Sequence, residues 1–407
     1  MPPIRIHSAT ELRAIGNNLS HTGDYQLARD ITLDPSWSPI SRGDNIILDG
    51  DGHRVGPLHA PLFDTLSDAT VFELSLDLNI SDSLAATGGL ARTAARSTLQ
   101  DISSYGSVGG AGAVGGLVGD MSDCSIERCQ QNASVSGCAG TGGFAGSAAR
   151  CQFIECRNTG SVRACSGAAG GVAGSLTGTG VCQGCVNEGA VTTRGAGGGG
   201  VAGLALSGDE GGGAGSIAIT DCRNMGEIAS GADAGGIVGA ALGGGVKIES
   251  CVSLAAVASM SARAGGVCGR VDGGAALVNN KSRVKVSASE SRAGGIVGGA
   301  DGAAVIQGSV VDGGYVLAPN YARRVLGSPP PDRASVTLSG NRAASRVRLR
   351  DTPGGPGVTV SNEESEAIAS GLDGESYDCP DGLEPGAESI DADWDDALRE
   401  MLRGLMA

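Results

Sequence analysis

The sequence contains very few aromatic residues, with 2 Trp, 4 Phe and 5 Tyr among 407 residues. This scarcity excludes a broad core built on large rings, and it favours a thin core of small side chains. No stretch approaches the ~18 consecutive apolar residues that a membrane-spanning helix needs. The four histidines all lie at or before His59, and none belongs to an HExxH sequence, so this zinc-peptidase motif is absent.

Positive charge is also scarce, because 29 Lys and Arg face 44 Asp and Glu, giving a net charge of −15. A chain this acidic repels nucleic acid, and we therefore expect no nucleic-acid partner. Only the arginines between residues 323 and 350 would favour binding to nucleic acid.

Glycine is abundant instead, at 71 residues, and it occurs as pairs that recur through the middle of the chain. Successive pairs are separated by 27, 27, 28, 29, 36, 30 and 29 residues, and seven of the eight pairs open a GGxxG pentamer. A period of this size indicates a stacked-repeat protein. The pairs begin at Gly88, Gly115, Gly142, Gly170, Gly199, Gly235, Gly265 and Gly294.

A second block related to C-x-N-x-G-x-V recurs 13 or 14 residues before the next glycine pair. Its apolar pieces are short or alternate with polar residues, which is typical of strands, and glycine interrupts every candidate helix. We therefore predict an all-β fold, a parallel β-helix or β-solenoid with one repeat per coil. The alternative, a disordered glycine-rich chain, would not keep these residues in phase. The block begins at Cys129, Cys156, Cys185, Cys222 and Cys251.

Composition divides the chain into four predicted parts. Residues 1–80 lack the glycine repeat and form an N-terminal cap with opening coils, including a helical turn at 9–18 in which Thr10 and Arg13 do not make a capping box. Residues 81–320 form the GGxxG solenoid, and residues 321–360 form irregular closing coils. Residues 361–407 hold 14 acidic residues against two arginines and form an acidic tail with a helix at 390–405.

The predicted C-terminal helix has one apolar face. That face allows two interpretations, a cap folded on the last coil or a docking helix through which residues 389–407 bind a partner. The residues proposed for docking are Trp394, Leu398, Met401, Leu402 and Leu405.

The glycine and cysteine blocks resemble the GLUG-motif repeats of bacterial surface proteins. The opening segments SATELRAIGNN, YQLARDITL, WSPI and ILDGDGHRV are similar to the usual entry of such arrays, and the likeness covers about residues 4–362. The resemblance implies a right-handed parallel β-helix with an adhesin-like role, a protein or surface glycan ligand, a cell-surface or extracellular location and no shared catalytic site. The start of the chain has no signal-peptide h-region, so a cytoplasmic location is the alternative.

The cysteines are the most prominent chemical feature. Adjacent coils lie about 4.8 Å apart, so one cysteine per coil builds a core ladder, whose thiols can stay reduced, form disulfides or hold a metal. Cys124, Cys151 and Cys182 form a second file, and Cys138 and Cys165 follow the valine of their blocks. A lone CxxC without nearby histidine does not support a zinc site, and we predict neither metal nor cofactor.

The sequence thus predicts a non-enzymatic repeat protein, an adhesin-like or structural rod used for binding or display. Its ligand surface is expected along one face or on variable turns such as 204–216. One alternative is a polysaccharide-active β-helix enzyme, a lyase or hydrolase, which would require carboxylates and basic side chains from separate coils to converge. Another alternative is an intracellular scaffold that docks through its C-terminal helix.

Overall fold

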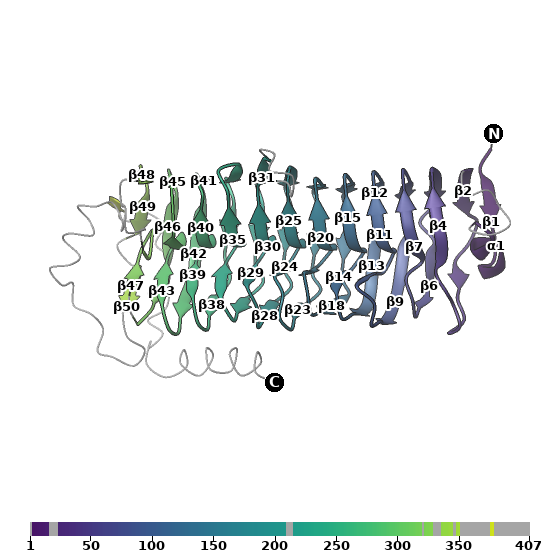
Figure 1. The fold of residues 1–407 in the computed structure, drawn as a ribbon, viewed down its shortest axis with the longest axis horizontal. Coiled ribbons are helices and arrows are strands. Elements are labelled where there is room, and N and C mark those ends of the chain that lie inside the picture. Colours follow the sequence, from purple (N-terminus) through teal and green to yellow (C-terminus); the bar gives the residue numbers. More distant parts are fainter. Residues whose placement is uncertain are drawn as a thin grey trace.

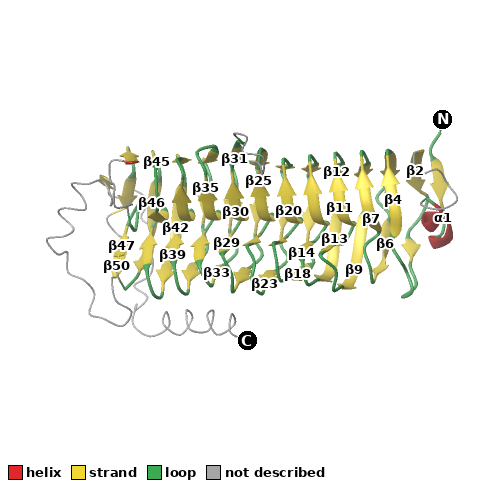
Figure 2. Cartoon of the chain, viewed as in Figure 1, coloured by secondary structure: helices red, strands yellow, loops and turns green. Residues whose placement is uncertain are grey.

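Parallel strands that stack from coil to coil form nearly all of the described chain, and together they make an elongated rod (Figure 1). The computed structural model describes residues 2–15, 23–208, 215–319, 321–328, 335–344, 347–350 and 375–377. Figure 2 shows one α-helix, near the N-terminal end of this described part, and strands joined by loops and turns along the rest of the rod. The predicted all-β parallel β-solenoid is confirmed.

Two parallel sheets run along the rod on either side of the larger core. Sheet A has 13 described strands and sheet C has 10. Sheet A contains β1 (Ile4–Ile6), β2 (Gly23–Leu27), β5 (Ile46–Asp49), β8 (Thr70–Phe72), β12 (Thr98–Gln100), β16 (Ser125–Glu127), β21 (Gln152–Ile154), β26 (Gly180–Gln183), β31 (Ile217–Thr220), β36 (Val246–Glu249), β41 (Ala275–Val278), β45 (Ala304–Gln307) and β48 (Val336–Ser339). Sheet C contains β4 (Ile40–Asp44), β7 (Phe63–Ser67), β11 (Ala91–Ala95), β15 (Val118–Ser122), β20 (Ala145–Ala149), β25 (Ala173–Thr177), β30 (Ala202–Leu206), β35 (Val238–Leu242), β40 (Cys268–Asp272) and β44 (Val297–Ala300).

Sheets B and D complete each coil, so the chain passes through sheets C, A, B and D in turn. Sheet D has nine described strands: β10 (Ala86–Gly88), β14 (Ala113–Gly115), β19 (Thr141–Gly142), β24 (Ala169–Gly170), β29 (Gly197–Gly199), β34 (Asp233–Gly235), β39 (Arg263–Gly265), β43 (Arg292–Gly294) and β47 (Tyr321–Arg323).

Sheet B uses one long strand in some coils and two short strands in others. Its long or single strands are β3 (Ile31–Thr32), β6 (Arg54–Leu58), β9 (Ser75–Ser81), β13 (Ser103–Gly109), β42 (Lys281–Ala288) and β46 (Val310–Leu317). Its remaining strands are β17 (Gln130–Gln131), β18 (Ser134–Gly137), β22 (Arg157–Asn158), β23 (Val162–Ala164), β27 (Val186–Asn187), β28 (Val191–Thr193), β32 (Arg223–Asn224), β33 (Ile228–Ser230), β37 (Val252–Ser253), β38 (Val257–Ser259), β49 (Arg342–Ala344), β50 (Arg348–Arg350) and β51 (Glu375–Tyr377).

The short helix α1 (Ala9–Ala14) covers the N-terminal end of the rod, with Leu12 fully buried. The Ser8 hydroxyl accepts a hydrogen bond from the Glu11 amide at 3.2 Å, and the Glu11 carboxylate accepts one from the His7 amide at 2.6 Å. The helix therefore has a cap related to the S-x-x-E type, in which Glu11 binds the amide of His7 rather than that of Ser8 itself. This cap was not predicted, because the spacing was tested from Thr10 rather than from Ser8.

The glycine pairs lie where each coil turns from sheet D into sheet C, and their backbone contacts the next coil. A Cβ atom on Gly171 would overlap the carbonyl oxygen of Gly200 and the side-chain amide of Asn187. Gly200 bears the same relation to Gly236 and Asn224. The recurring glycine pair therefore provides a close approach of backbones that no other residue permits.

The asparagines opposite these glycines form a buried ladder. Asn158 donates to Asn187 at 2.7 Å, and Asn187 donates to Asn224 at 2.8 Å. Each side chain also donates to the carbonyl oxygen two residues further along its own chain, at 2.9–3.0 Å. The side-chain NH₂ groups of Asn158 and Asn187 thereby find two acceptors each, and that of Asn224 donates to the Gly226 carbonyl oxygen, although all three side chains are fully buried.

In the middle coils, the ladder and the glycine pairs set a smaller hydrophobic core apart from a larger one. The larger core runs along the described rod and draws on all four sheets. The smaller core lies between sheet D and the second strands of sheet B. The smaller core consists of Val162, Ala164, Ala169, Val191, Ile228, Ala234 and Val257.

Charged residues occupy left-handed turn positions between sheets C and A. Asp68, Arg96, Asp123 and Arg150 stand on successive coils with φ between 47° and 55°. Arg96 binds Asp68 through two hydrogen bonds of 2.7 and 2.8 Å, and Arg150 binds Asp123 through two of 2.8 and 2.9 Å. These two-point ion pairs offset the strain of φ > 0 at residues other than glycine.

Replacing Gly171 with alanine should lower the free energy of unfolding by about 3 kcal/mol, because the new methyl group must displace backbone atoms. Urea denaturation followed by circular dichroism measures the change. The matched control is Gly109→Ala, whose methyl group would meet only the Ser136 hydroxyl at 3.1 Å and the Ile80 carbonyl oxygen at 3.7 Å. Equal stability of the two variants would contradict the proposed close approach.

Candidate functional site

The structure places the five predicted ladder cysteines, Cys129, Cys156, Cys185, Cys222 and Cys251, in one file inside the larger core. Each is at most 1% exposed, and each thiol donates to a carbonyl oxygen of the preceding coil at 3.4–3.7 Å. Burial raises the pKa of the Cys156 thiol well above its usual range. Protonated and inaccessible thiols pack as small apolar groups and do not act as nucleophiles.

The file continues beyond Cys251 with other residue types. Asn280, Ser309 and Asn341 take the next positions, and each accepts a hydrogen bond from a backbone amide in the preceding coil at 3.0–3.2 Å. The cysteines are therefore one solution among several for filling the same narrow position.

The predicted second file needs a correction. Cys124 and Cys151 occupy equivalent positions, but Cys182 lies opposite Phe153 in the register of β21 and β26. The spacing in the sequence already sets it apart, because Cys124 and Cys151 lie nine residues after their glycine pairs and Cys182 lies twelve after its own. Cys138 and Cys165 form a disulfide between adjacent coils, with Cα atoms 4.6 Å apart. Among the described residues, no cluster of three His, Cys, Asp or Glu side chains has a geometry that could hold a metal ion.

The predicted turn at 204–216 and the predicted C-terminal docking helix lie partly or wholly outside the described residues. Residues 204–206 belong to strand β30 and not to a surface turn, while residues 209–214 lie outside the described chain. The predicted docking residues, Trp394, Leu398, Met401, Leu402 and Leu405, also lie outside the described residues, so the helix and its role stay predictions.

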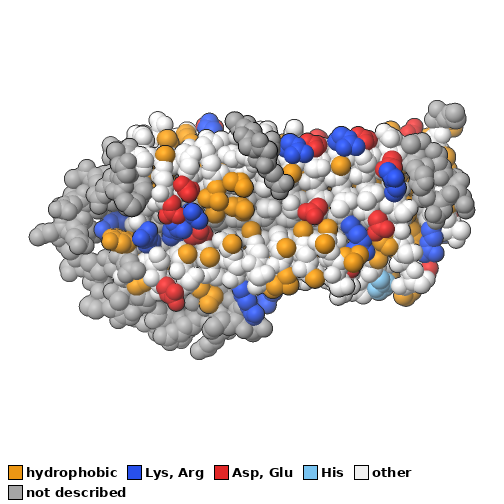
Figure 3. Space-filling view, viewed as in Figure 1, with side chains coloured by type: hydrophobic (Ala, Val, Ile, Leu, Met, Phe, Trp, Pro, Cys, Tyr) orange, Lys and Arg blue, Asp and Glu red, His pale blue; other side chains and the backbone are white. Residues whose placement is uncertain are grey.

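Charged side chains from separate coils converge at more than one place in the described structure. Arg92 binds both Asp64 and Asp82, and a second network lies at the start of strands β34 and β39 in sheet D. Arg263 binds Asp233 at 2.9 Å and also binds Asp301, which in turn lies 2.9 Å from Arg270. Burial raises the pKa of the Asp233 carboxyl, although Arg263 opposes the shift. Figure 3 shows acidic and basic side chains gathered on this face of the rod. Both carboxylates of this network are held by arginines, which is the arrangement of a structural ion-pair network.

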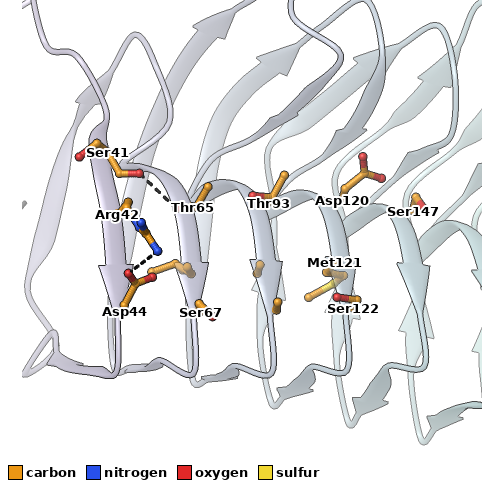
Figure 4. Close-up of a pocket in the computed structure, with 13 residues that line it drawn as sticks. Ser41, Arg42, Asp44, Thr65, Ser67, Thr93, Asp120, Met121, Ser122 and Ser147 are labelled. Carbon is orange, nitrogen blue, oxygen red and sulfur yellow. Dashed lines mark hydrogen bonds and ion pairs between the residues drawn. The ribbon is translucent and has the colours of Figure 1, made fainter. Parts of the chain in front are cut away.

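The groove in the described structure lies elsewhere, on the outer face of sheet C near the N-terminal end of the rod. It has a volume of about 730 Å³ and is lined by side chains from strands β4, β7, β11, β15 and β20. Along its centre, Thr65, Thr93, Asp120 and Ser147 stand in register on successive strands (Figure 4). This central file presents a hydroxyl or carboxylate once per coil, about every 4.8 Å.

The groove is limited to these first strands, because the same register position changes character along the rod. Ser175 follows Ser147, and the next three positions are Leu204, Ala240 and Arg270. The groove was not predicted from the sequence, because its lining residues share no repeated motif and only the register of the strands aligns them.

Asp120 is the carboxylate at the centre of the groove. Partial burial raises the pKa of its carboxyl, and a hydrogen bond with Ser147 opposes the shift. The neutral form is therefore favoured at the floor of the groove more than in water.

Comparisons with known proteins identify no family for this chain and return only remote structural similarities. No protein-family model and no curated protein matches the chain. Among solved structures, a Bacteroides ovatus protein provisionally assigned as an immunoglobulin A1 protease is 17% identical, with a TM-score of 0.33 over 88% of this chain and 79% of that one. A structure named IgA1 protease is 18% identical, with a TM-score of 0.41 over 96% of this chain and 26% of that one.

A third solved structure, tailspike protein 3 of bacteriophage CBA120, is 11% identical, with a TM-score of 0.29 over 86% of this chain and 59% of that one. At these TM-scores the three similarities carry no argument about the fold or the function of this chain. Within the described ranges of the chain, no helix is long and apolar enough to cross a membrane.

Replacing Asp120 with asparagine should stabilise the protein at pH 7 and not at pH 3. The pKa of the Asp120 carboxyl is higher in the folded protein than in the unfolded chain. The stability that the neutral carboxyl contributes is therefore fully present below the unfolded-state pKa, and it is lost as the pH rises through the folded-state pKa. Asparagine keeps the neutral state at every pH. Thermal unfolding of both proteins across this range measures the difference, and a melting-temperature gap that is independent of pH would contradict the raised pKa.

Proposed function

We propose that this chain is a non-enzymatic, adhesin-like rod whose groove on sheet C binds an extended surface glycan. The supporting observation is the file of polar side chains on the outer face of a continuous sheet. Thr65, Thr93, Asp120 and Ser147 provide hydroxyl and carboxylate groups along a straight line. Such groups match the hydroxyl-rich edge of a linear polysaccharide.

The face of a paired sheet favours a glycan over an added peptide strand. Strand β11 is paired on both sides, with β7 and β15, so its backbone groups are already hydrogen-bonded. A peptide that recognises sheets by strand addition needs a free edge, which the groove does not offer. Recognition in the groove must therefore proceed through side chains.

The arrangement of charges favours binding over cleavage. The groove contains the carboxylates of Asp44 and Asp120, and Asp44 is held by Arg42 at 2.8 Å. Asp233 and Asp301 in the other charged cluster are also bound by arginines. Glycoside hydrolysis requires two carboxyl groups that flank one bond and are able to exchange protons with it. Asp44, Asp233 and Asp301 are bound by arginines instead, which favours binding over cleavage.

The test is binding of the full chain to an array of bacterial surface polysaccharides, followed by calorimetric titration with the best-retained glycan. Thr93→Arg places a long charged side chain in the middle of the groove, and the dissociation constant should rise at least about tenfold. The matched control is Gln152→Arg, an exposed position on sheet A, where the constant should stay unchanged.

Three outcomes would contradict the proposal. The array could retain none of the protein, or Thr93→Arg could bind as tightly as the unchanged protein. The glycan could also become shorter during incubation with the protein. Shortening would favour the alternative of a polysaccharide-active enzyme.

A further inference from the structure

Among the described cysteines, one pair differs from all the others in its exposure. Cys165 is exposed and Cys138 is half-buried, and the two form the disulfide between adjacent coils. The nine free cysteines of the described chain are all buried. A reagent in solution can therefore reach the sulfur atoms of this pair while the folded rod protects the others.

The pair lies at the exit from sheet B, where the pairing of β18 with β23 brings Gly137 opposite Ala164. The next residues of both strands are Cys138 and Cys165, and the Cys165 amide donates to the Gly137 carbonyl oxygen at 2.8 Å. The register therefore places the two cysteines side by side. On the next coil the following residue is Arg194, so the pair has no third cysteine in register.

The disulfide precedes the two shortest strands of sheet D. Strands β19 (Thr141–Gly142) and β24 (Ala169–Gly170) have two residues each, whereas the other seven described strands of this sheet have three. Cys138 lies three residues before β19, and Cys165 lies four residues before β24. The covalent link thus lies beside a part of sheet D in which adjacent strands pair through only two residues, as β34 and β39 also do.

We propose that Cys138 and Cys165 form a thiol–disulfide exchange site that reacts with low-molecular-weight thiols and thereby fastens or releases β19 and β24. This proposal does not depend on the glycan-binding groove. The nine other described cysteines are free and buried, so their packing does not depend on the redox state of the exposed pair and the change stays local.

The exchange proceeds in two balanced steps. A small-molecule thiolate attacks the exposed sulfur of Cys165, and the bond to Cys138 breaks. Cys138 leaves as a thiolate and takes a proton from water. A second small-molecule thiol then attacks the sulfur of the first one, releases Cys165 as a thiol and departs as a small-molecule disulfide. The protein gains two electrons and two protons, which the two thiols supply.

The first experiment uses the full chain carrying Cys379→Ser, because Cys379 lies outside the described residues. The protein is exposed to oxidised or to reduced glutathione, alkylated while folded and analysed by peptide mass spectrometry. After reduced glutathione, Cys138 and Cys165 should carry the label, and Cys156 and Cys185 should acquire it only in denaturant. After oxidised glutathione, neither cysteine of the pair should be labelled.

Labelling of the pair after oxidised glutathione, or its protection after reduced glutathione, would overturn the exchange site. Labelling of Cys156 in the folded protein would overturn the selectivity.

The second experiment measures hydrogen–deuterium exchange in both redox states. Peptides spanning residues 138–142 and 165–170 should exchange at least about tenfold faster after reduction, while the equivalent peptide 228–235 should not change. The double variant Cys138→Ser/Cys165→Ser should exchange like the reduced protein in both buffers. Equal exchange before and after reduction, in protein whose thiols are shown to be free, would overturn the role in fastening the strands.

Discussion

The contact between a glycine pair and the next coil is the constraint on which the rest of this rod depends. At the corner between sheets D and C, two backbones and an asparagine side chain occupy the space in which a single Cβ atom would overlap. This close approach brings two walls of the coil together, and between residues 162 and 257 it sets a small hydrophobic cluster apart from the larger core. Because the interior is narrow, it is filled mainly by leucine, isoleucine, valine, alanine and cysteine, with few aromatic rings.

Much of this architecture was predictable from the sequence, because the close approach requires glycine and asparagine at fixed intervals along the chain. Gly171 and Asn187 come from separate blocks of the repeat, and their common period reflects one physical contact. Cys182 was assigned to the file of Cys124 and Cys151 although its spacing from the glycine pair differs from theirs, and the register places it opposite Phe153. The cap at Ser8 was readable in the sequence, yet it was sought from the wrong residue.

The groove on sheet C illustrates what periodicity cannot provide. Thr93 and Asp120 are neighbours only through strand pairing, and nothing in their sequence surroundings distinguishes them from other exposed residues. The repeat determines where a side chain points, and the variable positions determine what it offers to a ligand. A solenoid of this kind can therefore change its binding surface without altering its core. The boundaries predicted at residues 80, 320 and 360 also stay predictions, because composition alone defined them.

The charged turns between sheets C and A have a consequence for how such a rod can change in length. Along residues 68, 96, 123 and 150 the sign of the charge alternates from one coil to the next, and each arginine binds the aspartate before it. Deleting one coil here would place two like charges beside each other in adjoining left-handed turns. Deleting two coils would restore an aspartate beneath an arginine. In this stretch, a gene encoding the rod would therefore gain or lose repeats more readily as doublets than one at a time.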